Sequence, residues 1–294
     1  MAALTGNTAL AFAAIISAVF IWGSSFIVKP SLFAVIDPVQ VVFLQSIGGV
    51  ILLGSKHLLE RKSFRISRSE AFFIMISGGL GIALYQIILN YAIGLIGGVI
   101  CSIFTALIPA MCLLVDTGIF KKPWNLFSII SIALSFAGVL LIVSMAGAGE
   151  FSLLGYAVAL FSNGVWIYYC YFTNRRRTTA TSTVFLFYQL VGCTILLIPY
   201  MLLHPLDVSA LAGWKVFGQL AYMIILHGVL AYYLFIFAVG KLDVVVTNIS
   251  VNLVPIAALL CNYLFLNELI SVAQALGAAL VIFAVMLSSR AVGK

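Results

Sequence analysis

Long runs of apolar residues, separated by short polar gaps, cover almost the entire chain. About 20 apolar residues in an α-helix cross a hydrocarbon core of about 30 Å. The runs are continuous rather than alternating, which favours helices over the strands of a membrane barrel. The pattern therefore predicts an all-α membrane protein with ten transmembrane helices in a lipid bilayer. The ten runs lie at roughly 8–29, 38–58, 70–93, 97–119, 124–146, 151–172, 183–204, 214–239, 244–266 and 271–290.

The composition agrees with a membrane environment. Of the 294 residues, 64% are hydrophobic and 8% are charged, whereas a soluble domain carries about 25% charged residues. The net charge of +7 does not indicate nucleic-acid binding, because the basic residues stand in the gaps between apolar runs. The five cysteines lie inside apolar runs without metal-ligand spacing, so we expect neither metal nor cofactor. The first run is expected to be a retained helix rather than a signal peptide, because Met1–Thr8 contains no Lys or Arg.

Lysine and arginine are distributed unevenly between the two sets of gaps. With the N-terminus placed in the cytoplasm, 13 of these residues fall on the cytoplasmic side and two, Lys29 and Lys215, fall on the other. Short cytoplasmic loops carry such an excess of positive charge. We therefore predict a multi-pass protein of the plasma membrane (the inner membrane in a bacterium), with both termini cytoplasmic.

The chain also contains a weak internal repeat. A shift of 146 residues places Gly94 on Gly240 and Pro109 on Pro255, which marks these four as hinge or packing positions. The predicted halves are residues 1–147 and 148–294, with five helices each. Because five is odd, the second half must be inverted relative to the first. Inverted repeats are a recurring architecture of secondary transporters, with the substrate site at the repeat interface.

Polar residues in the middle of the apolar runs are the candidates for a binding site, because a buried polar group needs a partner or water. Gln86 and Asn90 share one helix face, as do Asn248 and Asn252. Two interpretations are open for these stripes, a shared cavity and hydrogen bonds between helices. The candidate cavity-lining residues are Trp22, Ser25, Lys29, Gln45, Tyr85, Gln86, Asn90, Thr105, Asn163, Trp166, Gln189, His227, Tyr232, Asn248 and Asn252.

Two of these candidates are ionisable. Lys29 either forms an electropositive mouth for a carboxylate or phosphate, or extends its ammonium group to the membrane interface. His227 either binds solute or protons, or is a hydrogen-bonded structural residue. No Asp or Glu lies at the centre of a predicted span; Glu268, for example, lies toward the outer side. We therefore expect facilitated transport or exchange, or proton coupling through His227.

Three stretches resemble the drug/metabolite transporter superfamily, and within it the EamA-type family of bacterial metabolite and amino-acid exporters. They are F-I-W-G-S-S-F-I-V-K at Phe20–Lys29, A-Y-Y-L-F-I-F-A-V-G-K-L at Ala231–Leu242, and N-L-V-P-I-A-A-L-L-C-N-Y-L-F-L-N-E at Asn252–Glu268. The resemblance implies two inverted five-helix halves and a central cavity lined by helices 1–4 and 6–9, with helices 5 and 10 peripheral. It also implies movement of small metabolites by alternating access. Lys122 departs from the family pattern, which often has Glu just past the fourth helix.

The combined prediction is a secondary active or facilitative transporter of small polar metabolites, with amino acids as the first substrate class. Its expected partners are a small-molecule substrate and the lipid bilayer. The alternatives are an intramembrane enzyme and a non-transporting membrane scaffold or receptor. The enzyme would need a cluster of His, Asp or Glu near one membrane face, and the sequence does not indicate such a cluster.

Overall fold

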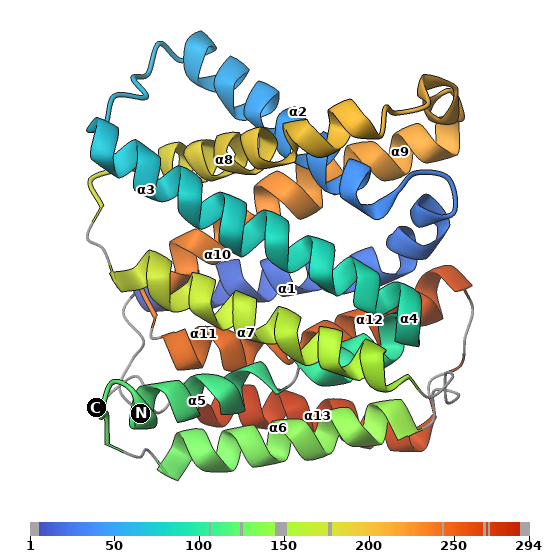
Figure 1. The fold of residues 1–294 in the computed structure, drawn as a ribbon. Coiled ribbons are helices and arrows are strands. Elements are labelled where there is room, and N and C mark those ends of the chain that lie inside the picture. The colour runs from blue at the N-terminus through green and yellow to red at the C-terminus, as the bar shows by residue number, and fades with distance from the viewer. Residues whose placement is uncertain are drawn as a thin grey trace.

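The chain is a bundle of helices, as a computed structural model shows for residues 6–105, 107–123, 126–144, 152–175, 178–242, 244–266, 269 and 271–288 (Figure 1). No strand occurs among these described residues. The first half contains α1 (Gly6–Phe33), α2 (Pro38–Leu59), α3 (Arg68–Gly78), the π-helical η1 (Gly79–Leu84), α4 (Tyr85–Thr105), α5 (Ile108–Gly118) and α6 (Leu126–Ser144). The second half contains α7 (Leu153–Arg175), α8 (Ser182–Leu203), the short η2 (Val208–Leu211), α9 (Trp214–Tyr222), the π-helical η3 (Met223–Ala231), α10 (Tyr232–Val239), α11 (Val244–Val251), α12 (Val254–Leu266) and α13 (Val272–Ser288).

These elements form the ten helices that the sequence predicts. Within the described part of the chain, seven stretches are long and apolar enough to cross a membrane: Asn7–Phe33, Pro38–Leu59, Arg68–Gly98, Leu153–Thr173, Ser182–Leu203, Trp214–Val239 and Val246–Phe265. Three shorter apolar helices, Ile108–Gly118, Leu126–Gly138 and Val272–Ala284, complete the set. The all-α prediction is confirmed.

Local sequence signals explain where several helices begin. Asp37 caps α2 by accepting a hydrogen bond from the backbone N–H of Val39 at 2.8 Å, and Pro38 follows at the first helical position. Ser67 caps α3 and Thr181 caps α8 in the same way. These caps satisfy backbone donors at the ends of the spans, where water and lipid headgroups meet.

The predicted spans at 97–119 and 244–266 are discontinuous, whereas the sequence predicted each as a single run. The turn expected at residues 94–96 is also displaced: Gly94 is helical, and the chain bends at Gly97, with φ of +78°. Only glycine adopts such a φ at low cost. The second interruption separates α4 from α5 just before Pro109, and the equivalent one separates α11 from α12 just before Pro255. Proline favours the first turn of the new helix because it lacks the N–H that a continuing helix would use.

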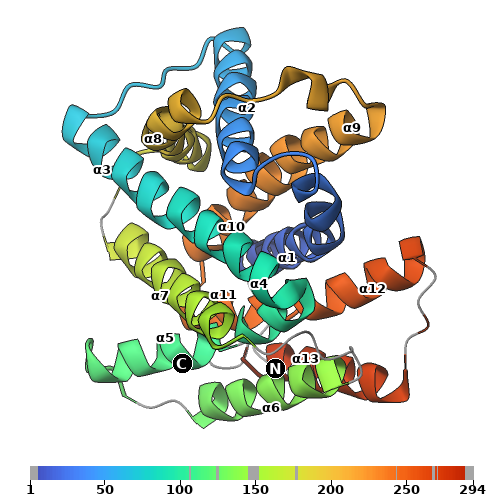
Figure 2. The ribbon, with the colours of Figure 1, turned by 45° about the vertical axis from the view of Figure 1, so that its right-hand side comes forward.

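The two halves share their irregularities and their packing. The 146-residue shift carries the start of α5 at Ile108 onto the start of α12 at Val254, and it carries η1 onto residues 225–230 within η3. Helix α1 packs on α10 and α12 of the second half, while α7 packs on α4 and α5 of the first. Helices α6 and α13 lie side by side at one edge of the bundle (Figures 1 and 2). This reciprocity is what two inverted repeats produce.

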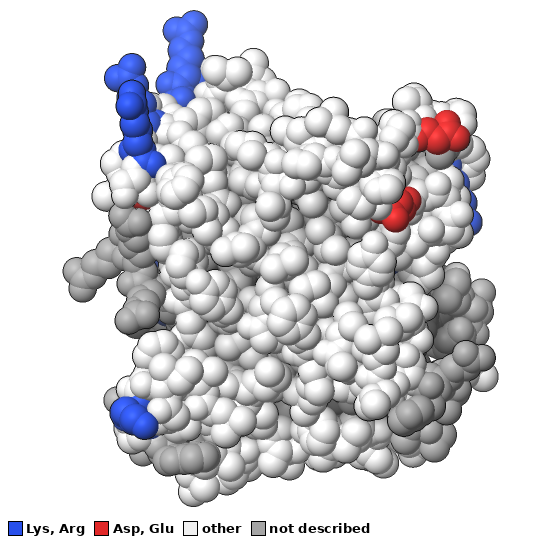
Figure 3. Space-filling model, in the orientation of Figure 1, with Lys and Arg blue, Asp and Glu red and all other residues white. Residues whose placement is uncertain are grey.

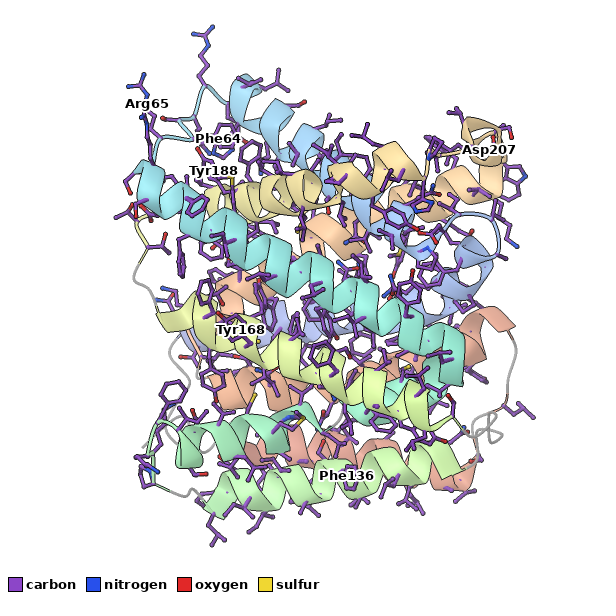
Figure 4. The ribbon with its side chains drawn as sticks, viewed as in Figure 1. Phe64, Arg65, Phe136, Tyr168, Tyr188 and Asp207 are labelled. Carbon is purple, nitrogen blue, oxygen red and sulfur yellow. The ribbon has the colours of Figure 1, made fainter. Side chains whose placement is uncertain are left out.

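The surface has a wide uncharged zone between two charged ends. Figure 3 shows Lys and Arg at the left edge of the view, and acidic groups together with further basic atoms at the right edge, with an uncharged surface between them. Arg65 and Asp207 mark these opposite ends in Figure 4. Large apolar side chains, including Ile51, Phe217 and Phe283, are exposed in the helices between. A soluble protein rarely exposes so much contiguous apolar surface, so lipid is its natural contact.

Candidate functional site

A buried cavity lies where the two halves meet. It is lined by α1, α4 and the start of α5 from the first half, and by α7, η3, α10, α11 and α12 from the second. Its volume is about 50 Å³, and one water needs roughly 10–15 Å³ of such space. The cavity therefore has room for roughly three to five waters or a small part of a solute. Its lining residues are Trp22, Ser25, Phe26, Lys29, Tyr85, Gln86, Leu89, Thr105, Ile108, Trp166, His227, Tyr232, Val251 and Val254.

Aromatic rings form one wall of the cavity. The ring of Trp22 lies 5.7 Å from that of Trp166 and 5.3 Å from that of Tyr232, in edge-to-face geometry. Tyr85 adds a contact of 4.8 Å to Trp166. Phe235 lies behind this wall, 5.4 Å from Trp22 and 5.0 Å from Trp166. We call Trp22, Tyr85, Trp166, Tyr232 and Phe235 the aromatic floor, because Phe235 lies beyond the lining residue Tyr232, toward the end of α10.

The end of the bundle below the aromatic floor is held by a polar cluster on α5 and α7. The hydroxyl of Tyr171 donates to the carboxylate of Asp116 at 2.8 Å and to the carbonyl of Cys112 at 3.0 Å. The ammonium of Lys122 pairs with the same carboxylate, 3.0 Å from Asp116 Oδ1 and 3.1 Å from Oδ2. Lys122, which departs from the pattern that the resemblance implies, thus neutralises an acid of its own half.

Several buried polar atoms at the cavity have no hydrogen-bond partner among the described residues. They are the indole N–H of Trp22, both side-chain amide atoms of Gln86, and Nδ1 of His227. Leaving a buried polar group unpaired costs about 1–3 kcal/mol. Ordered water or a polar group of a solute can pair with such atoms.

Comparisons with known proteins decide the family. The EamA-like transporter family matches residues 9–144 and 153–290, one match in each half. The chain belongs to the EamA-like transporter family. Members transport small metabolites across membranes and are not enzymes, so the protein is a multi-pass membrane transporter.

Structural comparison gives the same fold for this EamA protein. A crystal structure of another protein matches with a TM-score of 0.77 and 17% identity, over 96% of this chain and 97% of the other. At that identity the likeness shows the fold alone. The curated protein sequences contain no match to the chain.

Nine of the sequence-predicted site residues of this EamA protein meet at the cavity. They are Trp22, Ser25, Lys29, Tyr85, Gln86, Thr105, Trp166, His227 and Tyr232. Lys29, one of the predicted cavity-lining residues, is 3% exposed, so it does not extend its ammonium group to the membrane interface. The helix is the reason, because α1 continues through Pro30 to Phe33 and so carries Lys29 into the bundle.

The other six predicted residues do not line the cavity. Trp166 donates its indole N–H to Asn248 at 2.9 Å, and Asn252 donates to Ser135 at 2.6 Å. Asn248 and Asn252 therefore make hydrogen bonds between helices, which is the second interpretation that the sequence left open. Gln189 bonds to Ser77 at 3.1 Å. The remaining three, Gln45, Asn90 and Asn163, are buried among the helices.

The second and seventh membrane spans, α2 and α8, also differ from what the resemblance implies. Neither α2 nor α8 contributes a lining residue among those described. They pack against each other, and α8 also packs on α3. Gln45 lies on α2 and Gln189 on α8, which explains why both lie outside the cavity.

The structure adds apolar lining residues that sequence reasoning did not single out: Leu89, Ile108, Val251 and Val254. Leu89 follows Gln86 by one helical turn, so its position was open to prediction. Ile108 and Val254 directly precede Pro109 and Pro255, so the repeated prolines marked the right place in the chain. The other two predicted hinges, Gly94 and Gly240, lie in α4 and just after α10. Glu268 lies outside the described residues.

Proposed function

We propose that this EamA protein carries small polar metabolites, amino acids first, across the plasma membrane by alternating access around the central cavity. The observation that supports this most directly is a small cavity lined by both repeats, in which unpartnered polar atoms lie among aromatic and apolar side chains. Apolar walls with a few convergent polar groups are typical of small-molecule sites. Both termini are proposed to be cytoplasmic, from the distribution of Lys and Arg.

The two interrupted helices give the proposal a mechanical basis. The interruption after Thr105 and the interruption after Val251 both border the cavity. A broken helix changes its bend at little cost, because the hydrogen bonds there are already interrupted. On the side of the aromatic floor, opening would separate Tyr171 on α7 from Asp116 on α5. On the other side it would separate Gln40 from the carbonyl of His204, now 3.0 Å apart.

The test is uptake of radiolabelled amino acids into liposomes that contain the purified full-length chain. Trp166→Ala removes a ring of the aromatic floor and the hydrogen bond to Asn248. We expect it to reduce uptake about 30-fold, as losing about 2 kcal/mol of binding by an aromatic anchor does. Tyr168→Ala is the matched control, since Tyr168 lies two residues further along α7 and is 55% exposed (Figure 4). Equal uptake by the two variants, or none by the wild type, would contradict the proposal.

Two modes of energy coupling fit this function. They are facilitated transport or exchange, and proton coupling through His227. An imposed proton gradient across the same liposomes distinguishes them. If accumulation driven by the gradient persists in His227→Gln, proton coupling through this histidine is wrong. A scaffold or receptor would show no uptake under either condition.

A further inference from the structure

A buried positive charge lies at the cavity. The residue Lys29 is 3% exposed, and it lines the cavity together with Ser25 and Phe26 of the same helix. Its ammonium nitrogen lies 5.7 Å from the centre of the Phe26 ring, a cation–π distance. Such a contact compensates only part of the cost of removing an ammonium group from water.

No carboxylate neutralises Lys29 among the described residues. The acids within the described ranges are engaged elsewhere: Asp37 caps α2, Glu60 pairs with Lys62, Glu70 binds Thr178 and Thr179, Asp116 pairs with Lys122, and Asp207 binds Ser209. A buried charge is normally paired, so the cavity is built to receive an anion.

Two helix N-termini meet the same cavity. Helix α5 begins at Ile108 and α12 begins at Val254, and both of these residues are in the lining. A helix N-terminus carries a partial positive charge and favours a negative group nearby. Half-helix ends that point at anionic substrate groups occur in other transporter architectures. Here they add to the full charge of Lys29.

We propose that Lys29 binds the carboxylate of the transported solute, so that the substrates are monocarboxylates or zwitterions such as amino acids rather than amines or neutral compounds. This inference rests on the proposed function and narrows it. The unpartnered N–H groups of Trp22 and Gln86 are the hydrogen-bond donors available to the same solute. The aromatic floor receives the remainder of the molecule.

The charge balance favours a carboxylate over a phosphate group. A carboxylate carries one negative charge, which a single ammonium neutralises. A phosphate monoester carries a charge of about −1.5 to −2 at neutral pH. With one Lys and no Arg among the lining residues, part of that charge would stay uncompensated in a buried site.

The first experiment compares acids with their amides. Thermal unfolding of the purified full-length wild type is measured with each of a panel of amino acids and simple monocarboxylates, with the corresponding carboxamides and decarboxylated amines, and with inorganic phosphate. We expect stabilisation by some of the acids and none by their amides or amines, or by phosphate. Amides that stabilise as well as acids, stabilisation by phosphate alone, or no stabilisation by any acid would each overturn the inference.

The second experiment changes the lysine. Lys29→Met removes the charge and keeps the length of the side chain; Lys29→Arg keeps the charge. Lys215→Met, at an exposed position at the start of α9, is the matched control. In Lys29→Met we expect acid affinity to fall about 10- to 100-fold, as loss of a hydrogen bond to a charged group does. We also expect the ligand-free protein to unfold at a higher temperature, because an uncompensated buried charge is gone.

The outcomes separate this inference from the proposed function. If Lys29→Met unfolds at a lower temperature and binds acids with unchanged affinity, Lys29 is structural and the inference is wrong. If wild-type liposomes take up amides and acids equally, transport stands and the carboxylate site falls. If liposomes take up nothing while acids still bind through Lys29, the binding site stands and the transport proposal fails.

Discussion

Close packing of α3 on α8 depends on two glycines that face each other's helix backbone. A Cβ added at Gly78 would overlap the carbonyl oxygen of Gln189, and one added at Gly192 would overlap that of Met75. The thiol of Cys193 also donates to the carbonyl of Gly78 at 3.0 Å. Small residues allow such contact between membrane helices. Gly78→Ala and Gly192→Ala should therefore separate the two helices.

The magnitude follows from two opposing effects. Overfilling a packed interface costs about 1–3 kcal/mol, and here the obstacle is backbone rather than a flexible side chain. Alanine recovers about 0.4–1 kcal/mol by restricting the unfolded chain, since Gly78 has helical φ and ψ of −67° and −49°. The expected net loss is about 0.5–2 kcal/mol per site. Because one helix separation relieves both overlaps, the double variant should lose less than the sum.

The assay is denaturant-induced unfolding of the purified protein in detergent micelles. Gly164→Ala on α7 is the control, because a Cβ there meets no described atom within 4 Å. It should leave stability unchanged or raise it. If Gly78→Ala and Gly192→Ala behave like Gly164→Ala, or if their losses add in full, the close-packing explanation is wrong.

Three further predictions follow from hydrogen bonds described above. Trp166→Phe leaves Asn248 Oδ1 without its 2.9 Å donor and should lower the free energy of unfolding by about 1–3 kcal/mol, measured in the same titration. Asn252→Ala breaks the 2.6 Å bond to Ser135 and should cost roughly 0.6–1.7 kcal/mol; a change within error would show that this bond is not stabilising. Asp116→Asn keeps an acceptor for Tyr171 but loses the ion pair with Lys122, so the free energy of unfolding should fall by less than about 1 kcal/mol. Asp116→Ala also removes the acceptor, so it should lower the free energy of unfolding by about 1–3 kcal/mol more. The same variant should increase the leak of solute from liposomes.

The helical spans were predictable because lipid imposes a simple rule. Each crossing needs about 20 apolar residues, and the chain obeys this in almost every segment. The interruptions were not predictable from hydropathy, because Leu107 and Leu253 at the breaks are as apolar as their neighbours. Pro109 and Pro255 pointed to bends, but α5 and α12 begin as separate helices there. Both π-helical stretches, η1 and η3, also escaped, since the glycines in them indicate bending or close packing but do not specify a π-turn.

The site was predictable in kind but not residue by residue. A buried amide avoids lipid equally well by lining a cavity or by bonding to a neighbouring helix, so the sequence does not distinguish Gln86 from Asn252. Gln86 and Asn90 share a face, yet a cavity of about 50 Å³ touches only the first. The burial of Lys29 was not predictable, because the apolar run ends near this residue whereas α1 continues to Phe33.

The matching π-helical stretches show how closely the two halves correspond. η1 and η3 fall at equivalent places in two halves whose sequences have otherwise diverged widely. A π-turn is a rare geometry, less stable than the regular helix around it. Its presence at the same register in both EamA matches means that the repeat extends from the sequence to this local backbone geometry.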